Sequence, residues 1–269
     1  MPKDPAEAAR WRHTRLRRRM LEGGWDQDLV ERIQEYLDAT REAALGMPST
    51  ALNLFASVVR QLNVLYDEPP RITHDDMTPA QQEAWAAAVH GARMWGVLQR
   101  NAEYVIALRE CLVRPEWSPR GYLTFRTVTP DCVVATAPPD DPSDIQILRE
   151  ARYHARGADH VGYWDTWDIA DPSAPRHYAV DVDGKDISAE VFGAAAGDPY
   201  PYIDDDGAPF IPYVLYRAQH TAKTWDPCAF LELVDGTLDV AVEWTFWIHL
   251  LLHVSWPQRY GTDVDVQGA

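Results

Sequence analysis

Apolar side chains recur at helical spacing through the front third of the chain. They return every three or four residues at 26–45 and again at 50–66, which is the period of an amphipathic helix. Residues 78–81, Thr-Pro-Ala-Gln, combine a capping threonine, a proline at the first helical position and a glutamine at the third, so a third helix should begin there. We expect this helix to be long, to continue to about Leu112 and to end at Pro115.

From Gly121 onward the pattern changes to short extended segments separated by turn-forming residues. The expected strands are 122–128, 132–135, 146–154, 160–169 and 176–182, followed by a buried strand at 210–216. Proline and aspartate gather at 129–131, 138–142 and 171–172, and Asp183-Gly184 is typical of a hairpin turn. The middle of the chain therefore predicts an antiparallel meander.

The last predicted helix, at 231–255, is apolar on nearly all sides. A helix of this kind must be buried, either in a thick core or against copies of itself. The expected interface residues between subunits are Trp244, Trp247, Ile248 and Leu251. The predicted fold class is α+β, with an α+β region at 1–230, the long apolar helix at 231–256 and a tail at 257–269.

Composition and charge narrow the possible functions. The 269 residues include 25 Lys and Arg against 41 Asp and Glu, and the formal net charge of −16 argues against a protein that grips nucleic acid over its whole surface. Eleven Trp and twelve Tyr are typical of large cores or subunit interfaces. Three widely spaced cysteines provide neither a disulfide framework nor a zinc pattern. We expect no signal peptide and no membrane segment.

The first twenty residues reverse the charge of the rest of the chain, with seven basic residues against two acidic ones. One hypothesis is an arm that contacts nucleic acid or a partner through Arg15, Arg17, Arg18 and Arg19. The alternative, which we favour, is a solvated first helix whose arginines pair with acidic neighbours.

Candidate chemistry is sparse in the sequence. His249 and His253 are four residues apart on the last helix and could share a metal ion, but Leu250 stands where a zinc hydrolase needs a glutamate. There is no Gly-rich phosphate loop and no nucleophile elbow. We therefore expect no catalytic, cofactor-binding or metal-binding residues, and keep a metal-dependent hydrolase using these two histidines as an alternative.

Four groups of segments, in this order, resemble the front half of tailed-bacteriophage portal proteins, the head–tail connectors. They are residues 53–66 running into 67–70, residues 121–123 with 129–131, residues 212–216 leading to 225–227, and residues 233–238 leading to 256–260. The resemblance implies a portal wing-like α+β region followed by a stem-like helix. Portals usually continue into clip and crown regions, which are not evident after Tyr260.

The resemblance also implies a function and a set of partners. A portal is a ring of identical subunits, typically a dodecamer, at one capsid vertex, through which double-stranded DNA is packaged and ejected. The implied partners are further copies of the chain, the major capsid protein, terminase and a head–tail adaptor protein. The implied location is the virion, with assembly in the host cytoplasm. A virion adaptor that binds the portal is a further alternative.

Overall fold

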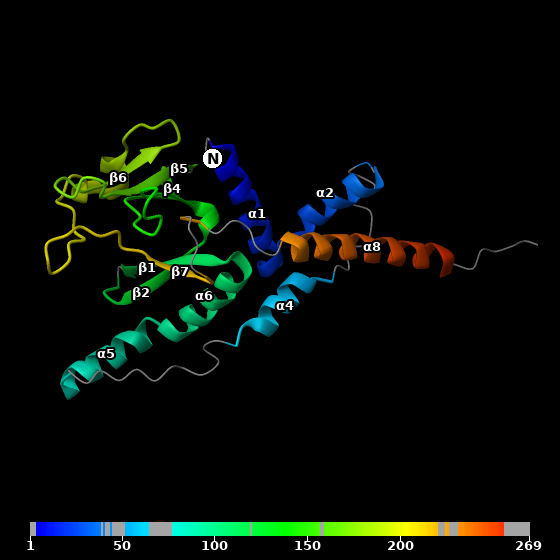
Figure 1. Ribbon diagram of the computed structural model, residues 1–269, viewed down its shortest axis with the longest axis horizontal. Helices are drawn as coiled ribbons and strands as arrows, with labels where there is room; N and C mark the ends of the chain where they lie inside the picture. Colours follow the sequence, from blue (N-terminus) through cyan, green and yellow to red (C-terminus); the bar gives the residue numbers. More distant parts are fainter. Residues whose placement is uncertain are drawn as a thin grey trace, which may run out of the picture.

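Helices precede and follow two antiparallel sheets in this α+β protein (Figure 1). The computed structural model describes residues 4–38, 40, 44, 52–64, 77–118, 120–156, 159–219, 224–225 and 231–255. The described helices are α1 (Pro5–Glu22), α2 (Asp26–Leu37), α4 (Leu54–Leu62), α5 (Pro79–Gly91), α6 (Met94–Leu108), α7 (Ser188–Phe192) and α8 (Leu231–Ser255). The strands are β1 (Glu110–Trp117), β2 (Leu123–Val128), β3 (Val133–Thr136), β4 (Ile147–Arg156), β5 (Asp159–Asp168), β6 (Arg176–Asp181) and β7 (Val214–Arg217).

The first two predicted helices are present with shorter bounds, and the start of the third is as predicted. Helix α2 ends at Leu37 because Asp38 adopts a left-handed conformation, with φ of 47°. Helix α4 begins after Asn53, whose side chain accepts a hydrogen bond from the backbone N–H of Ala56. The capping box predicted at the start of the third helix is confirmed. The side chains of Thr78 and Gln81 each accept a hydrogen bond from the backbone N–H of the other residue.

The prediction of one long helix from Thr78 to Leu112 is wrong. The chain is left-handed at Arg93, which separates α5 from α6, and again at Arg109, which ends α6. Strand β1 then takes residues that the periodicity assigned to the helix. Pro115 lies inside this strand, opposite Phe125 of β2 and past the last β1 residue that pairs with β7. Proline is tolerated in such a locally unpaired position because it has no N–H to donate.

The extended segments form two sheets instead of one meander. The strand order β3-β4-β5-β6 is a true antiparallel meander, whereas β2 joins β1 and β7 in a separate sheet of order β2-β1-β7. The predicted strand at 210–216 is confirmed only in part, since β7 begins at Val214. Two exposed turns begin at Asp181 and Asp204, and each of these carboxylates accepts hydrogen bonds from two backbone N–H groups.

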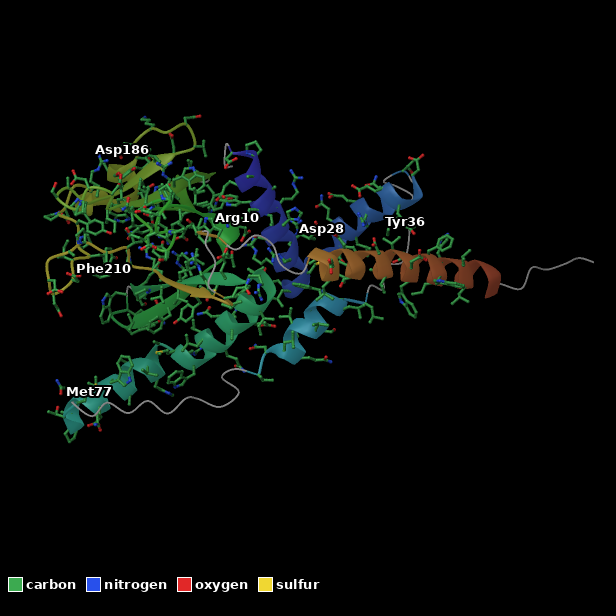
Figure 2. All side chains as sticks on the ribbon, viewed as in Figure 1. Arg10, Asp28, Tyr36, Met77, Asp186 and Phe210 are labelled. Carbon is green, nitrogen blue, oxygen red and sulfur yellow. The ribbon has the colours of Figure 1, made fainter. Side chains whose placement is uncertain are left out.

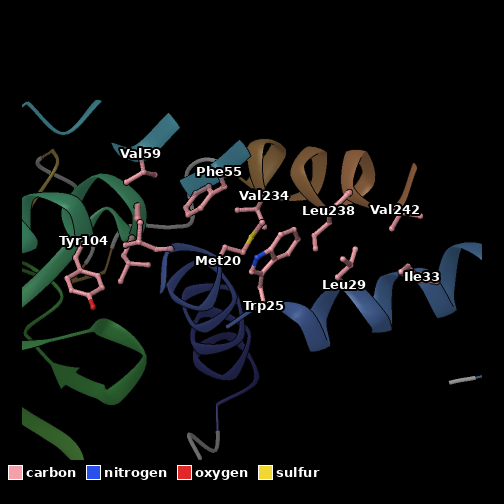
Figure 3. Packing of buried hydrophobic residues seen from close by; sticks show 14 of the residues in the cluster. Met20, Trp25, Leu29, Ile33, Phe55, Val59, Tyr104, Val234, Leu238 and Val242 are labelled. Atoms are coloured by element: carbon pink, nitrogen blue, oxygen red, sulfur yellow. The ribbon is translucent and has the colours of Figure 1, made fainter. Parts of the chain in front are cut away.

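The two larger apolar clusters connect the main parts of the molecule. One lies among the helices, where Val234 and Leu238 of α8 face Trp25 and Leu29 (Figure 3). The other lies between the sheets and is centred on Trp167, which is fully buried. The first cluster therefore fixes α8 to the helical part, and the second fixes one sheet against the other.

Candidate self-association surface

Helix α8 is attached to the rest of the protein through one face only. Its buried residues Val234, Leu238, Ala241 and Val242 pack within the helical cluster beside α2 and α4. The description of this helix as apolar on nearly all sides and buried is therefore wrong. Its first half also carries exposed carboxylates, and much of its second half is exposed to solvent. Figure 1 shows its C-terminal turns extending past α2.

Polar contacts set the position of α8 along α2. Nε and Nη2 of Arg32 lie 3.1 and 2.9 Å from Oδ1 of Asp239, and this hydrogen-bonded pairing raises the pKa of the Arg32 guanidinium. One turn further along, the hydroxyl of Tyr36 donates to Glu243 at 3.3 Å, beside α8 in Figure 2. These contacts fix which face of α8 is turned away from the body.

That outward face carries a stripe of large apolar side chains. Val240, Trp244, Trp247 and Leu251 follow one another at steps of four, three and four residues, which places them on one side of a helix. Their exposed fractions are 44%, 45%, 58% and 60%. Contiguous exposed apolar surface of this kind is typical of interaction sites, whereas singly scattered exposed residues are not informative. We call these four residues the α8 stripe.

The residues predicted to lie at a subunit interface are Trp244, Trp247, Ile248 and Leu251. The structure puts three of them on the α8 stripe, while Ile248 is half-buried at its border. Sequence reasoning missed Val240, although the spacing of four, three and four residues would have identified it. It also missed Leu250, which is exposed beside the stripe, and Phe246, which is exposed on another side of the helix.

The four N-terminal arginines do not form one surface. Arg17 is buried within α1, and Arg19 is paired with Asp28. Arg18 donates to Thr129 at 2.9 Å and lies 3.1 Å from Asp131, and Nε of Arg15 is 3.7 Å from the same carboxylate. The geometry favours the alternative of pairing with acidic neighbours, although that helix is embedded and not solvated all round. Contact of these arginines with nucleic acid stays a prediction.

A second polar constellation lies between the two sheets. Asp165 is buried and contacts His177 at 2.7 Å, Arg152 at 3.0 Å and Arg114 at 3.3 Å. The guanidinium of Arg114 also lies over the indole ring of Trp167, 4.6 Å from its centroid. The carboxylate therefore has cationic or hydrogen-bonding partners from β1, β4 and β6.

Glu150 is the other buried carboxylate of this constellation. It lies opposite Arg126 of β2 in a two-pronged arrangement and accepts a hydrogen bond of 2.6 Å from the hydroxyl of Tyr213. Burial and the neighbouring Glu150 charge raise the pKa of Tyr213 far above its usual value. For Asp165, burial acts to raise the pKa, but the hydrogen bond and charge of His177 and the charge of Arg114 outweigh it and lower the pKa. Asp165 is therefore held ionised, and the contacts of both carboxylates link the two sheets.

The described residues contain no cluster of three or more His, Cys, Asp or Glu side chains suited to a metal ion. His249 is half-buried on α8, and the side chain of His253 lies outside the described residues, as does the tail at 257–269. Within the described part of the chain, no helix is long and apolar enough to cross a membrane. No known family matches the chain, and no curated protein is significantly similar to it in sequence.

Proposed function

We propose that this protein is a structural subunit of portal type, which assembles laterally through α8 into a ring at a capsid vertex. The α8 stripe carries this proposal, because it leaves large aromatic surface uncovered on a helix that is otherwise firmly attached. The ordered resemblance of residues 50–260 to portal proteins gives the ring its proposed identity. The role is architectural and requires no catalytic site.

The energy available from the stripe is sufficient for assembly when it is repeated around a ring. Each half-exposed indole, Trp244 and Trp247, has about 100 Å² left to bury, which corresponds to about 2.5 kcal/mol per side chain. Leu251 and Val240 add a smaller amount each. Part of this gain offsets the loss of translational and rotational freedom, so each contact is moderate, and closure of the ring stabilises all contacts together.

A closed ring requires the stripe to meet a different surface on the neighbouring copy. At the C-terminal end of α4, Leu62 and Val64 just beyond it are exposed apolar side chains. We assign this patch as the acceptor of the α8 stripe. Substitution of Leu62 by Asp should then weaken assembly as strongly as a substitution within the stripe.

The acidic balance of the chain is consistent with a passive DNA conduit. A wall with net charge of −16 per subunit makes few phosphate contacts, so duplex DNA slides along it and is not held. In the proposed role the ring docks terminase during packaging and an adaptor protein afterwards, and it is seated among copies of the major capsid protein in the virion.

The decisive experiment is the oligomeric state of the purified full chain, measured by native mass spectrometry and negative-stain electron microscopy. The wild-type protein should form closed rings, and the double variant Trp244→Ser with Trp247→Ser should be monomeric with an unchanged circular dichroism spectrum. Trp117→Ser is a matched control, because Trp117 is also strongly exposed but lies at the end of β1. This control should assemble as the wild type does.

Two results would refute the proposal. The first is a wild-type chain that stays monomeric at high concentration, which would leave the stripe to a different partner. The second is equal assembly by the wild-type protein and the double variant, which would move the interface away from α8.

A further inference from the structure

A hollow of about 420 Å³ lies between α1 and the β4–β5 hairpin. The strand register explains its shape. Ala151 is opposite Trp164, and Tyr153 is opposite Gly162, so all four residues share one face of the sheet. On this face the two smallest residues, Ala151 and Gly162, are diagonal neighbours across the two strands. The two aromatic residues, Tyr153 and Trp164, which form the aromatic walls of the hollow, are diagonal neighbours in the other direction. Neither small residue has a long side chain that would fill the hollow, although the ring of Tyr153 lies over Gly162.

The aromatic walls are held in place by their neighbours. The ring of Trp11, from α1, lies 5.9 Å from that of Trp164 at an angle of 50°. Nε1 of Trp11 donates to the carbonyl of Val133 at 3.3 Å, which fixes the indole. The ring of Tyr153 lies across Gly162, since a Cβ atom there would be 3.7 Å from Cε1 of the tyrosine. Tyr153 is nevertheless 77% exposed, so the outer face of its ring is available to a ligand.

Two arginines from α1, Arg15 and Arg18, complete the lining on one side. A single carboxylate positions both of them: Asp131, whose side chain is 1% exposed, lies 3.1 Å from Arg18 and 3.7 Å from Arg15. Within the described residues, the two terminal nitrogens of Arg15 donate no hydrogen bond. Glu22, 4.0 Å from Arg18, accepts a hydrogen bond from Tyr104 and does not line the hollow. The terminal nitrogens of Arg15 therefore remain available to a ligand beside the aromatic walls.

We propose that this hollow binds one nucleotide, with its base stacked on the ring of Tyr153 and its phosphate on Arg15. A ligand on the face of a sheet meets side chains, because the backbone donors and acceptors lie in the plane of the sheet. Stacking and charge are then the available interactions, and these are the two that every nucleotide satisfies. The volume suits a ligand of this size. The inference goes beyond ring assembly and does not depend on it.

The acidic surface of the protein limits how far a nucleic-acid strand is held. Because the chain as a whole has a net charge of −16, only phosphates next to the bound base gain from contact with this local basic patch. Binding of a single strand should therefore depend weakly on salt, with a slope of about −0.7 for each phosphate contacted. A duplex, whose bases are already stacked on one another, should bind poorly.

The test uses fluorescence anisotropy of the full chain with a labelled ten-nucleotide single-stranded oligodeoxyadenylate. Competition with adenosine monophosphate distinguishes the source of the ligand: full competition assigns a free nucleotide, and binding of the strand alone assigns a nucleotide within a strand. Tyr153→Ala should weaken binding at least about fivefold through the lost stacking. Arg15→Gln should reduce the salt slope by about 0.7. Gly162→Val should weaken binding by displacing the ring of Tyr153, which lies over Gly162.

Matched controls are Tyr122→Ala and Arg176→Gln, two exposed residues outside the hollow. Both should bind as the wild type does. Thermal unfolding checks that each variant is folded. If Gly162→Val is destabilised, the result is decided by Tyr153→Ala, which changes an exposed side chain. Absence of binding by both the strand and the mononucleotide would overturn the proposal. So would wild-type affinity in Tyr153→Ala, or stronger competition by an acidic peptide containing tyrosine.

Discussion

The junction between the two sheets gives the sharpest stability prediction. Asp165 of β5 is buried and joins Arg114 of β1, Arg152 of β4 and His177 of β6. Replacement by Asn keeps the size of the side chain but removes its charge. The two guanidinium groups then lose their shared counter-charge, and Arg114 is itself largely buried.

The magnitude follows from the burial of the pair. Removing one partner from a buried, hydrogen-bonded ion cluster costs about 3–5 kcal/mol, because the remaining charge stays desolvated. Arg114 retains an ion pair with Glu116 at 3.2 Å. We therefore expect Asp165→Asn to lower the free energy of unfolding by about 3 kcal/mol, at the lower end of this range. For a chain of this length, such a loss lowers Tm by about 6–12 °C.

Chemical denaturation in urea at several pH values measures this effect. The pKa of Asp165 is lowered in the folded state, so its ionised form stabilises the protein above the unfolded value of about 3.9. That contribution is lost as the pH falls through the folded pKa. The difference in unfolding free energy between wild type and Asp165→Asn should therefore be full near neutral pH and should shrink below about pH 4.

Asp171→Asn provides the matched control. The pKa of Asp171 is also lowered, by hydrogen bonds from Ser173, but this carboxylate lies in an exposed turn. Its replacement should change the neutral-pH unfolding midpoint very little. The reasoning is refuted if Asp165→Asn is as stable as the wild type near neutral pH, or if its deficit grows as the solution is acidified.

Two further predictions concern single sites. Burial, together with the nearby Glu110 charge, raises the pKa of Cys111 to about 12. This thiol should therefore react with iodoacetamide at pH 8 only after urea unfolds the chain, as measured by mass spectrometry. Fast labelling of Cys111 in the native protein would contradict this prediction. Arg93 is exposed and has a φ of 50°, a left-handed conformation that glycine adopts without strain. Arg93→Gly should therefore raise the free energy of unfolding by about 0.5–1 kcal/mol. A lower Tm would show instead that the arginine side chain is itself stabilising.

The sequence predicted elements well where the signal is local. The start of α5 at Thr78-Pro79 follows from capping chemistry that acts within one turn, and the hairpin turn at Asp183-Gly184 follows from φ preferences of single residues. The strands of the meander were also located to within a few residues, because each alternates beside a clear turn signal. Such features need no knowledge of distant parts of the chain.

The same local signals failed for residues 109–112. Their apolar spacing continues that of α6, so periodicity favoured a helix, yet β1 forms because Leu112 and Val113 pair with β2 on one side and β7 on the other. The pairing with Leu215 and Val214 joins positions about a hundred residues apart. A sequence window cannot contain that partner, and tertiary pairing overrides local propensity.

The candidate sites divide in the same way. The sequence alone predicts that Trp244, Trp247 and Leu251 share one side of a helix, because residues three or four apart are neighbours on any α-helix. Only the tertiary structure decided that this side faces outward, since α2 and α4 cover the opposite one. Likewise, the charges of Arg15 and Arg18 are visible in the sequence, but their shared Asp131 lies more than a hundred residues away, and folding alone brings it within reach.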